Sequence, residues 1–253
     1  MMLKKWEDLP PEMQCDEVRE YYDILKKKQV SLFFKRTFDI VVSLIMLIIL
    51  SPVFLILAIA IKIDSPGPVF YRQERVTQYG RHFRIFKFRS MVNNADKSGT
   101  AVTVKDDCRI TKTGRFIRKF RLDEISQLID VLRGTMTFVG TRPEVPKYVE
   151  YYTPEMMATL LLPAGVTSLA SIYYKDEAEL LDAAVDPDRT YIDEVLPGKM
   201  EYNLRELREF GFWKQIGVMV KTVGAVFKKE SKDKAENMPE PIYSVTVGGK
   251  NNE

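Results

Sequence analysis

Residues 40–61 constrain this chain more than any other part of it, because the segment holds 22 residues and no charged side chain. A straight helix of that length would measure about 33 Å, enough to cross a hydrocarbon core of about 30 Å. The pair Ser51–Pro52 lies in the middle of the segment. Proline lacks the backbone N–H and clashes with the preceding turn, so a kink is expected there. The Ser51 hydroxyl could satisfy a carbonyl freed at that point.

Basic residues flank this segment on both sides. Lys35 and Arg36 precede it, and Lys62, Arg72 and Arg75 follow it. A spanning helix usually has its Lys and Arg excess on one side of the membrane. We therefore expect a re-entrant helical hairpin over 35–63, broken at the Ser–Pro pair, with arms of about 11 residues that reach about 16 Å. A kinked single span is the alternative. A cleavable signal peptide does not fit, because the segment begins late and no small-residue cleavage site follows it.

The length and charge of the chain limit the classes of protein that it can be. Its 253 residues are enough for one sizeable domain or two small ones. The net charge of +3 gives no reason to expect a nucleic-acid partner. Lys and Arg are dense over 72–121, which favours an anionic ligand or an anionic membrane surface. An ordinary solvated basic face has the same composition.

Cysteine and histidine are too scarce for several kinds of site. Cys15 and Cys108 are far apart and have no metal-ligand spacing, so neither a disulfide scaffold nor a cysteine zinc site is expected. His82 is the only histidine, which makes a Ser–His–Asp triad hard to build. Carboxylates and basic side chains are therefore the groups expected to carry any catalysis.

The chain divides into four predicted parts: an N-terminal helical extension over 1–34, the membrane segment over 35–63, a folded domain over 64–230 and a disordered tail over 231–253. In the domain, VFYRQERV and HFRIFKF alternate around a QYG turn and predict a small β-hairpin. From about residue 113 onward the pattern is helical with short loops.

Residues 212–229 predict an amphipathic helix with basic edges. Its apolar side chains recur at helical spacing and are Trp213, Ile216, Val220, Val223 and Phe227. Such a helix suits a membrane interface. A helix packed on the core of the domain would show a similar pattern, so both placements stay open.

The stretch FIRKFRLDEISQLIDVLRGTMTFVGTRPEVP, at 116–146, is the richest in chemical groups. The adjacent carboxylates Asp123 and Glu124 stand beside basic residues, at the first turn of a predicted helix. The apolar face of that helix consists of Leu122, Ile125, Leu128, Ile129 and Leu132. Exposed N–H groups and nearby guanidinium groups should lower the pKa of such carboxylates. An ionised carboxylate there could ligate Mg²⁺ or attack phosphorus, and Arg suits phosphate oxygens. Charges that merely stabilise a helix end are the alternative.

Seven motifs occur in a specific order along the chain. They are KRTFD (35–39), the Ser–Pro-interrupted apolar segment, DSPGPVFYRQERV (64–76), FKFRSM (86–91), ITKTGRFIRKFRLDEISQL (110–128), GTMTFVGTRPEVP (134–146) and YIDEVLPGKMEYNL (191–204). In these motifs the chain resembles the bacterial sugar transferase family, which are monotopic polyprenyl-phosphate phosphoglycosyl transferases, from about residue 35 to about residue 223.

The resemblance implies an α+β, mostly helical fold with a re-entrant membrane hairpin, interfacial amphipathic helices and a small β-hairpin. It implies that residues 64–230 form a catalytic domain at the cytoplasmic face of the bacterial plasma membrane. The implied reaction moves a sugar 1-phosphate from a UDP-sugar to polyprenyl (undecaprenyl) phosphate and releases UMP, through a covalent phosphosugar–aspartyl intermediate. This would be the first membrane step of a surface polysaccharide or glycoconjugate pathway. Mg²⁺ is the implied cofactor, and a homodimer is one possible assembly.

The family's functional residues map onto positions of this sequence. Asp123 matches the nucleophile, and Glu124 matches the residue that helps to hold Mg²⁺. Arg118 and Arg142 match basic residues near the active site. The KFR motif supplies two further candidates for phosphate contact, Lys87 and Arg89. In the family the membrane helix turns back at its break, which corresponds to Ser51 and Pro52 here.

The chain departs from the usual family pattern at a few positions. Arg121 replaces the serine that often precedes Leu-Asp-Glu, and Thr135 replaces the aspartate of Gly-Asp-Met. Thr141 replaces the first proline of Pro-Arg-Pro, and AGVTS at 164–168 stands where Pro-Gly-Ile-Thr-Gly is common. These departures affect specificity and loop geometry more than the reaction. Two other functions stay open: a non-catalytic membrane-anchored scaffold that binds nucleotide-sugars, and a basic surface module for membranes or nucleic acid.

Overall fold

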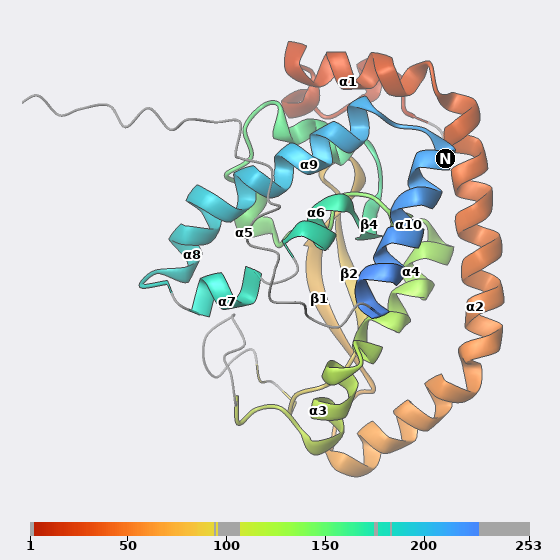
Figure 1. Cartoon of the computed structure of the whole chain (residues 1–253), viewed down its shortest axis with the longest axis vertical. Helices are drawn as coiled ribbons and strands as arrows, with labels where there is room; N and C mark the ends of the chain where they lie inside the picture. The colour runs from red at the N-terminus through yellow and green to blue at the C-terminus, as the bar shows by residue number, and fades with distance from the viewer. Residues whose placement is uncertain (1–2, 94, 96–106, 175–176, 183, 228–253) are drawn as a thin grey trace, which may run out of the picture.

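The computed structural model describes residues 3–93, 95, 107–174, 177–182 and 184–227. The predicted disordered tail at 231–253 lies outside them. Within the described residues the fold is α+β and mostly helical, with two separate two-stranded sheets and one long apolar helix (Figure 1). This confirms the predicted fold class at the level of secondary structure.

The elements follow one another along the chain in a regular order. The helices are α1 (Asp16–Lys26), α2 (Gln29–Asp64), α3 (Lys112–Lys119), α4 (Leu128–Arg133), α5 (Pro146–Val149), α6 (Leu169–Tyr173), α7 (Glu177–Asp182), α8 (Pro187–Thr190), α9 (Leu196–Arg208) and α10 (Phe212–Phe227). The strands are β1 (Phe70–Val76), β2 (His82–Phe88), β3 (Met136–Val139) and β4 (Ala164–Thr167). A 3₁₀ helix over Leu122–Gln127 leads into α4, and a π-helical turn over Tyr191–Val195 leads into α9.

The predicted hairpin is confirmed. β1 and β2 pair antiparallel, from Phe70 opposite Phe88 to Val76 opposite His82. The turn between them contains Tyr79 at φ 60° and Gly80 at φ 68°. Because strand side chains alternate between faces, Tyr71 and its partner Lys87 lie on one face of the hairpin.

The expectation of a purely helical pattern after residue 113 is wrong at two places. β3 and β4 form a parallel pair, with Met136 opposite Ala164 and Val139 opposite Thr167. All four residues of β3 are buried. A strand buried on both faces is a short apolar run without alternation, so periodicity cannot distinguish it from a buried helix. Gly165 packs so close to Gly140 that a Cβ there would lie 2.1 Å from the Gly140 oxygen.

The N-terminal extension is built into the main core. α1 lies across α9 (Figure 1), and its apolar stripe of Val18, Tyr22 and Leu25 is buried. These side chains belong to one cluster with Leu161 and Phe210, which follow much later in the chain. The extension therefore contributes core packing to the body that carries the other motifs.

The apolar segment forms a single unbroken helix. α2 has 36 residues with Pro52 inside it, so no non-helical residue separates two arms. The return of the segment at Ser51–Pro52 stays a prediction, because a continuous helix can still bend at a proline. The Ser51 hydroxyl donates to the Ile48 carbonyl at 2.8 Å, which is the carbonyl that the missing N–H of Pro52 leaves free. That bond confirms the role expected for Ser51 and explains how the helix continues. Of the described helices, α2 is the one long and apolar enough to cross a membrane.

Both halves of α2 pack on the same body. Before Pro52, Phe38 and Val42 contact the core that contains Val131, and after it Leu57 and Ile61 pack in the core that contains Ile117. Figure 1 shows α2 along one edge of the molecule, turning under α3 at its C-terminal end. The opposite face of α2 is exposed along most of its length, with Ile48, Ile49, Leu55, Ile56 and Ile59 among its outward side chains.

α10 combines the two placements that its pattern left open. Its Gln215 and Val218 are buried against the body, whereas Trp213 is 80% exposed and Val220 is 67% exposed. α10 packs beside α2 (Figure 1). The apolar stripe predicted from the sequence is thus the outward face of the helix, and a separate stripe packs inward. The side chain of Phe227 lies outside the described residues.

Candidate active site

The 3₁₀ helix Leu122–Gln127 holds the carboxylate pair. It begins after Arg121, whose φ of 51° is unusual for a residue with a side chain. Asp123 and Glu124 occupy its first turn. The Ser126 hydroxyl donates to the Phe86 carbonyl at 3.0 Å, which ties this turn to β2. The α-helix expected from residue 122 therefore starts later, at Leu128, after a tighter turn.

Glu124 is bonded to two cations from distant parts of the chain. Lys87 of β2 places its Nζ 3.4 Å from Glu124 Oε1. Arg142, from the loop after β3, donates to the same oxygen. Burial alone would raise the pKa of Glu124, but Arg142 and Lys87 outweigh that effect and lower the pKa to about 2. Glu124 is therefore ionised at any physiological pH.

Asp123 has a different environment from its neighbour. Burial, followed by the negative charge of Glu124, raises the pKa of Asp123, while Lys87 and Arg118 partly oppose that rise. The lowered pKa expected for both carboxylates is confirmed for Glu124 and wrong for Asp123. The physical reason is that the two nearest cations are bonded to Glu124. Neighbouring carboxylates with unequal environments are suited to unequal chemical roles.

Arg118 and Arg142 both lie near the pair, as expected from the sequence. The charge of Arg118, on α3, acts on Asp123. The Arg142 side chain is 33% exposed, and the charge of Glu124 raises its pKa. Burial lowers the pKa of Lys87, and the charge of Glu124 opposes that change. Together with Lys87, these residues make a cationic rim around two carboxylates.

Arg89 is placed elsewhere. Its guanidinium donates to the carbonyls of Ser65, at 2.6 Å, and Pro66, at 2.9 Å, just past the end of α2. The residue is 5% exposed. A phosphate contact would require Arg89 to leave these carbonyls, so the structure gives it a part in holding α2. Ser51 and Pro52 are exposed within the apolar length of α2, apart from the charged groups.

Arg75 belongs to the cationic rim, although sequence reasoning used it only as a basic flank of the membrane segment. Arg75 Nη1 donates to the Pro143 carbonyl at 3.1 Å, and its charge acts on Lys87 and Arg142. The alternation of β1 places Tyr71, Gln73 and Arg75 on the face that carries Lys87. That period of two was the signal that could have identified Arg75.

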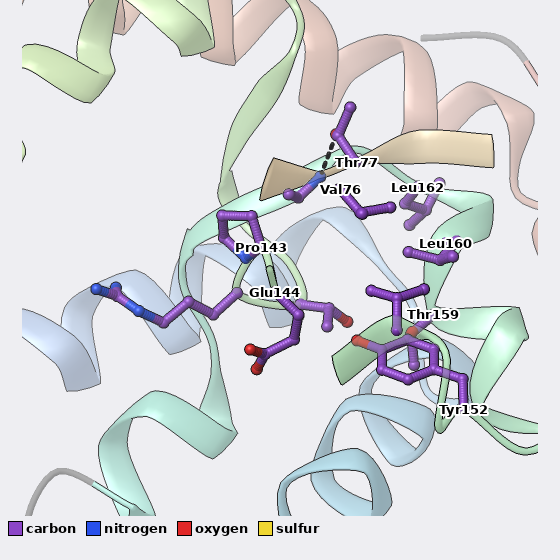
Figure 2. Close-up of a pocket in the computed structure, with 12 residues that line it drawn as sticks. Val76, Thr77, Pro143, Glu144, Tyr152, Thr159, Leu160 and Leu162 are labelled. Carbon is purple, nitrogen blue, oxygen red and sulfur yellow. Dashed lines mark hydrogen bonds between the residues drawn. The ribbon is translucent and has the colours of Figure 1, made fainter. Parts of the chain in front are cut away.

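The loop that carries Arg142 packs on a small pocket and is bonded to the end of β1. A small pocket lies behind it, with Pro143 and Glu144 on one side and Leu160 and Leu162 on the other (Figure 2). The Val76 N–H donates to the Glu144 carbonyl at 2.9 Å. The pocket is lined mainly by apolar side chains, together with Arg142 and Glu144 of the loop.

The donor set suits a magnesium ion that is shared with a phosphorylated substrate. Among the described residues no group of three or more His, Cys, Asp or Glu side chains could hold a metal. Asp123 and Glu124 nevertheless supply two adjacent carboxylates, and both cations bonded to Glu124 use one oxygen, Oε1. Mg²⁺ in proteins is commonly held by one or two carboxylates together with substrate phosphates and water. The residues present therefore fit such an ion.

Comparison of the sequence with known proteins shows which family it matches. A sequence model described as bacterial sugar transferase matches residues 30–229. The UDP-N-acetylgalactosamine-undecaprenyl-phosphate N-acetylgalactosaminephosphotransferase of Aeromonas hydrophila is 34% identical over 197 residues, covering 77% of this chain and 44% of that protein. The UDP-glucose:undecaprenyl-phosphate glucose-1-phosphate transferase of Klebsiella pneumoniae is 33% identical over 206 residues, covering 80% of this chain and 42% of that protein.

A third relative is closer in length. The UDP-glucose:undecaprenyl-phosphate glucose-1-phosphate transferase of Caulobacter vibrioides is 30% identical over 204 residues, covering 78% of this chain and 71% of that protein. The chain thus spans less than half of the first two relatives. In each case the match covers about four fifths of this chain.

Proposed function

Because this chain belongs to the bacterial sugar transferase family, we propose that it transfers a sugar 1-phosphate from a UDP-sugar to undecaprenyl phosphate and releases UMP. The observation that supports this activity best is the unequal pair at 123 and 124. Glu124 is neutralised by Lys87 and Arg142, whereas Asp123 beside it keeps a carboxylate that is less stabilised in its ionised form. A less stabilised carboxylate is the better nucleophile.

The proposed reaction has two displacements at one phosphorus. The Asp123 carboxylate attacks the sugar-proximal phosphorus of the donor, and the bond from that phosphorus to the UMP oxygen breaks. An oxygen of undecaprenyl phosphate then attacks the same phosphorus, and the bond to Asp123 breaks. The products are UMP and undecaprenyl diphosphate-sugar, and the carboxylate is regenerated.

The cationic rim would lower the barrier to both steps. An anionic nucleophile is repelled by a diphosphate, and positive groups offset that repulsion and the charge that develops on the leaving phosphate. Arg142 and Lys87 are already placed at Glu124, with Arg118 and Arg75 nearby. Glu124 would help to hold Mg²⁺, which when bound supplies Lewis-acid polarisation of the phosphate oxygens.

The membrane arrangement is also a proposal. Arg36 donates to the Val131 carbonyl at 2.7 Å near the start of α2, and Asp64 at its end accepts a bond from the Thr113 N–H at 2.8 Å. Both ends of α2 are thus bonded to one folded body, and the outward face between them is apolar. We propose that α2 enters the cytoplasmic face of the bacterial plasma membrane and does not cross it, with its bend at Ser51 and Pro52.

Labelling of engineered cysteines tests this arrangement. In a background where Cys15 and Cys108 are replaced by serine, Lys28→Cys and Lys62→Cys place thiols at the two exposed ends of α2. A membrane-impermeant maleimide should label neither position in intact cells and both after permeabilisation. Labelling of one end from outside would show a span and overturn the proposal.

Release of UMP tests the activity. The full chain is incubated with Mg²⁺, undecaprenyl phosphate and a panel of UDP-glucose, UDP-galactose and UDP-N-acetylgalactosamine. One donor should support release, and Asp123→Asn should lower it at least about 10³-fold because the nucleophile is lost. Asp188→Asn, at an exposed acid paired with Lys147, is the matched control and should leave release unchanged. Full activity in Asp123→Asn would mean that another group attacks, and no release with any donor would favour a non-catalytic scaffold.

A further inference from the structure

A buried group of polar side chains lies behind the loop that carries Arg142, and the proposed reaction gives it no part. Tyr191, on the π-helical turn, donates its hydroxyl to Glu144 Oε1 at 2.5 Å. Lys199, one turn into α9, places Nζ 3.0 Å from the Tyr191 oxygen and 3.5 Å from Glu144 Oε1. Glu144 is 7% exposed and Lys199 is 5% exposed.

Lys199 also bonds a second carboxylate. Its Nζ lies 3.1 Å from Glu177 Oε2 on α7. One buried ammonium therefore stands between two acids from different elements, Glu144 and Glu177. Removing a charge from a buried group of this kind leaves its partner without compensation, which is strongly unfavourable.

Both of these acids act on Arg142. Glu144 follows Arg142 by two positions, and the loop between them is held by Arg75, which donates to the Pro143 carbonyl. The charge of Glu124 has the largest effect on the Arg142 guanidinium, and the charges of Glu144 and Glu177 act on it in the same direction. Three carboxylates therefore attract one guanidinium, and only Glu124 lies with Asp123 in the rim.

We propose that Lys199 and Tyr191 are positioning residues that keep Arg142 directed to Glu124 and to the donor's diphosphate. Lys199 pairs with both Glu144 and Glu177, and Tyr191 donates to the Glu144 oxygen, so the attraction of each acid for the guanidinium is reduced. Without Lys199, Glu144 and Glu177 both act on Arg142, and Glu144 also acts on Arg75, which is already bonded to the Pro143 carbonyl. Electrostatic attraction in a partly buried setting is strong enough to redirect Arg142 toward these acids. This inference rests on the proposed function, since it assigns a purpose to a side chain that would bind the donor.

Binding of UDP, measured by calorimetry on the full chain in detergent with Mg²⁺, tests the inference through a double-mutant cycle. Lys199→Met should weaken UDP binding about tenfold. In an Arg142→Met background the same change should have no further effect on UDP binding, because the side chain through which it acts is gone. Lys199→Met combined with Glu144→Gln should recover most of the loss, since the more buried of the two unpaired carboxylates is removed. Lys147→Met, at an exposed lysine paired with Asp188, is the matched control and should bind like wild type.

The outcomes separate the inference from the proposed function. Failure of the wild-type chain to bind UDP, together with no UMP release, would overturn the proposed function, and the positioning role would fall with it. Wild-type binding that Lys199→Met leaves unchanged would overturn the positioning role alone. Equal losses with and without Arg142 would also overturn it, because they would show a general structural defect.

A milder variant keeps the test decisive if Lys199→Met does not fold. Tyr191→Phe retains the ring and the Lys199–Glu144 pair and removes only the hydroxyl that Glu144 accepts. It should weaken UDP binding by about threefold in the wild-type background and leave it unchanged in Arg142→Met. Unchanged binding in both backgrounds would overturn the part assigned to Tyr191.

Discussion

Two groups of charged residues in this molecule differ in what their charges are bonded to. In the first, on α2, Lys35 donates to the Val139 carbonyl at 2.8 Å and to Gln215 Oε1 at 3.0 Å. Asp39, one turn later, accepts bonds from the Thr137 hydroxyl at 2.7 Å and from a backbone N–H. We call Lys35 and Asp39 the α2 anchor. Both are almost fully buried, and the hydrogen bonds that hold them come from neutral groups of the body.

The second group, the site cluster, consists of Lys87, Asp123, Glu124 and Arg142. Here Lys87 and Arg142 are bonded to the Glu124 carboxylate, with Asp123 beside it, at a place that is partly open to solvent. A charge that satisfies a buried carbonyl cannot leave without exposing that carbonyl to an unfavourable environment. A charge that pairs with another charge at an opening can exchange that partner for a phosphate oxygen. The comparison therefore separates charges that fold the chain from charges that are available to a ligand.

Removing a carboxylate from the site cluster should have the largest effect on activity. Glu124→Gln keeps the shape of the side chain but removes the charge that Arg142 and Lys87 share. We expect kcat/KM for UMP release to fall about 10³-fold, and the free energy of unfolding at neutral pH to fall by no more than the contribution of the two ion pairs. Glu150→Gln, at an exposed acid, is the matched control and should change neither quantity. Near-normal activity in Glu124→Gln would mean that Glu124, like Lys35 and Asp39, serves to stabilise the fold and not to bind a ligand.

Removing a cation from the α2 anchor should have the opposite outcome. Lys35→Met leaves the Val139 carbonyl and the Gln215 oxygen without their buried donor. The free energy of unfolding should drop by about 3 kcal/mol, since each unsatisfied buried group costs 1–3 kcal/mol. The fraction that stays folded should keep kcat/KM within about twofold, as expected for a residue outside the site. The control is Lys62→Met, an exposed lysine on the same helix.

Loss of activity in a Lys35→Met protein of normal stability would contradict the distinction between the α2 anchor and the site cluster. It would mean that the anchor contributes to the reaction as well as to the fold. Denaturant unfolding followed by tryptophan fluorescence, with UMP release measured on the same preparation, distinguishes the two results.

Acid titration should reveal the site cluster through its effect on stability. The pKa of Glu124 is lowered from 4.5 to about 2 in the folded chain. Above pH 4.5 the carboxylate is ionised in both states, so its full contribution, up to about 3 kcal/mol, favours folding. Between pH 4.5 and about 2 the unfolded chain takes up the proton first, and the contribution is lost. The unfolding free energies of wild type and Glu124→Gln should therefore converge over that pH window. A constant difference would show that the ion pairs of Glu124 do not stabilise the folded chain.

Local patterns in the sequence predicted part of this structure. The alternation in VFYRQERV and HFRIFKF identified the hairpin, and the uncharged run at 40–61 identified α2. Proline chemistry identified the bond from Ser51 that compensates Pro52. The carboxylate pair and its arginines came from motif order, and the structure brings Asp123, Glu124, Arg142 and Lys87 together.

What could not be predicted depends on contacts between residues far apart in the chain. The Lys35 bond to Val139 joins positions 104 apart, and that of Asp39 to Thr137 joins positions 98 apart. Nothing local distinguishes these charges from ordinary basic and acidic flanks of a membrane segment. The same holds for Glu144, whose partners Tyr191 and Lys199 come from another element. The unequal pKa values of Asp123 and Glu124 likewise depend on which carboxylate the distant cations reach.

Ser51 gives the smallest expected effect and extends the comparison to a group that is neither anchor nor site. Ser51→Ala removes the donor to the Ile48 carbonyl, and the free energy of unfolding in detergent should fall by about 1 kcal/mol. Pro52→Ala restores an N–H at position 52 that can bond the same carbonyl. Ser51→Ala made in that background should therefore cost almost nothing. Equal losses in the two backgrounds would show that Ser51 acts outside the helix.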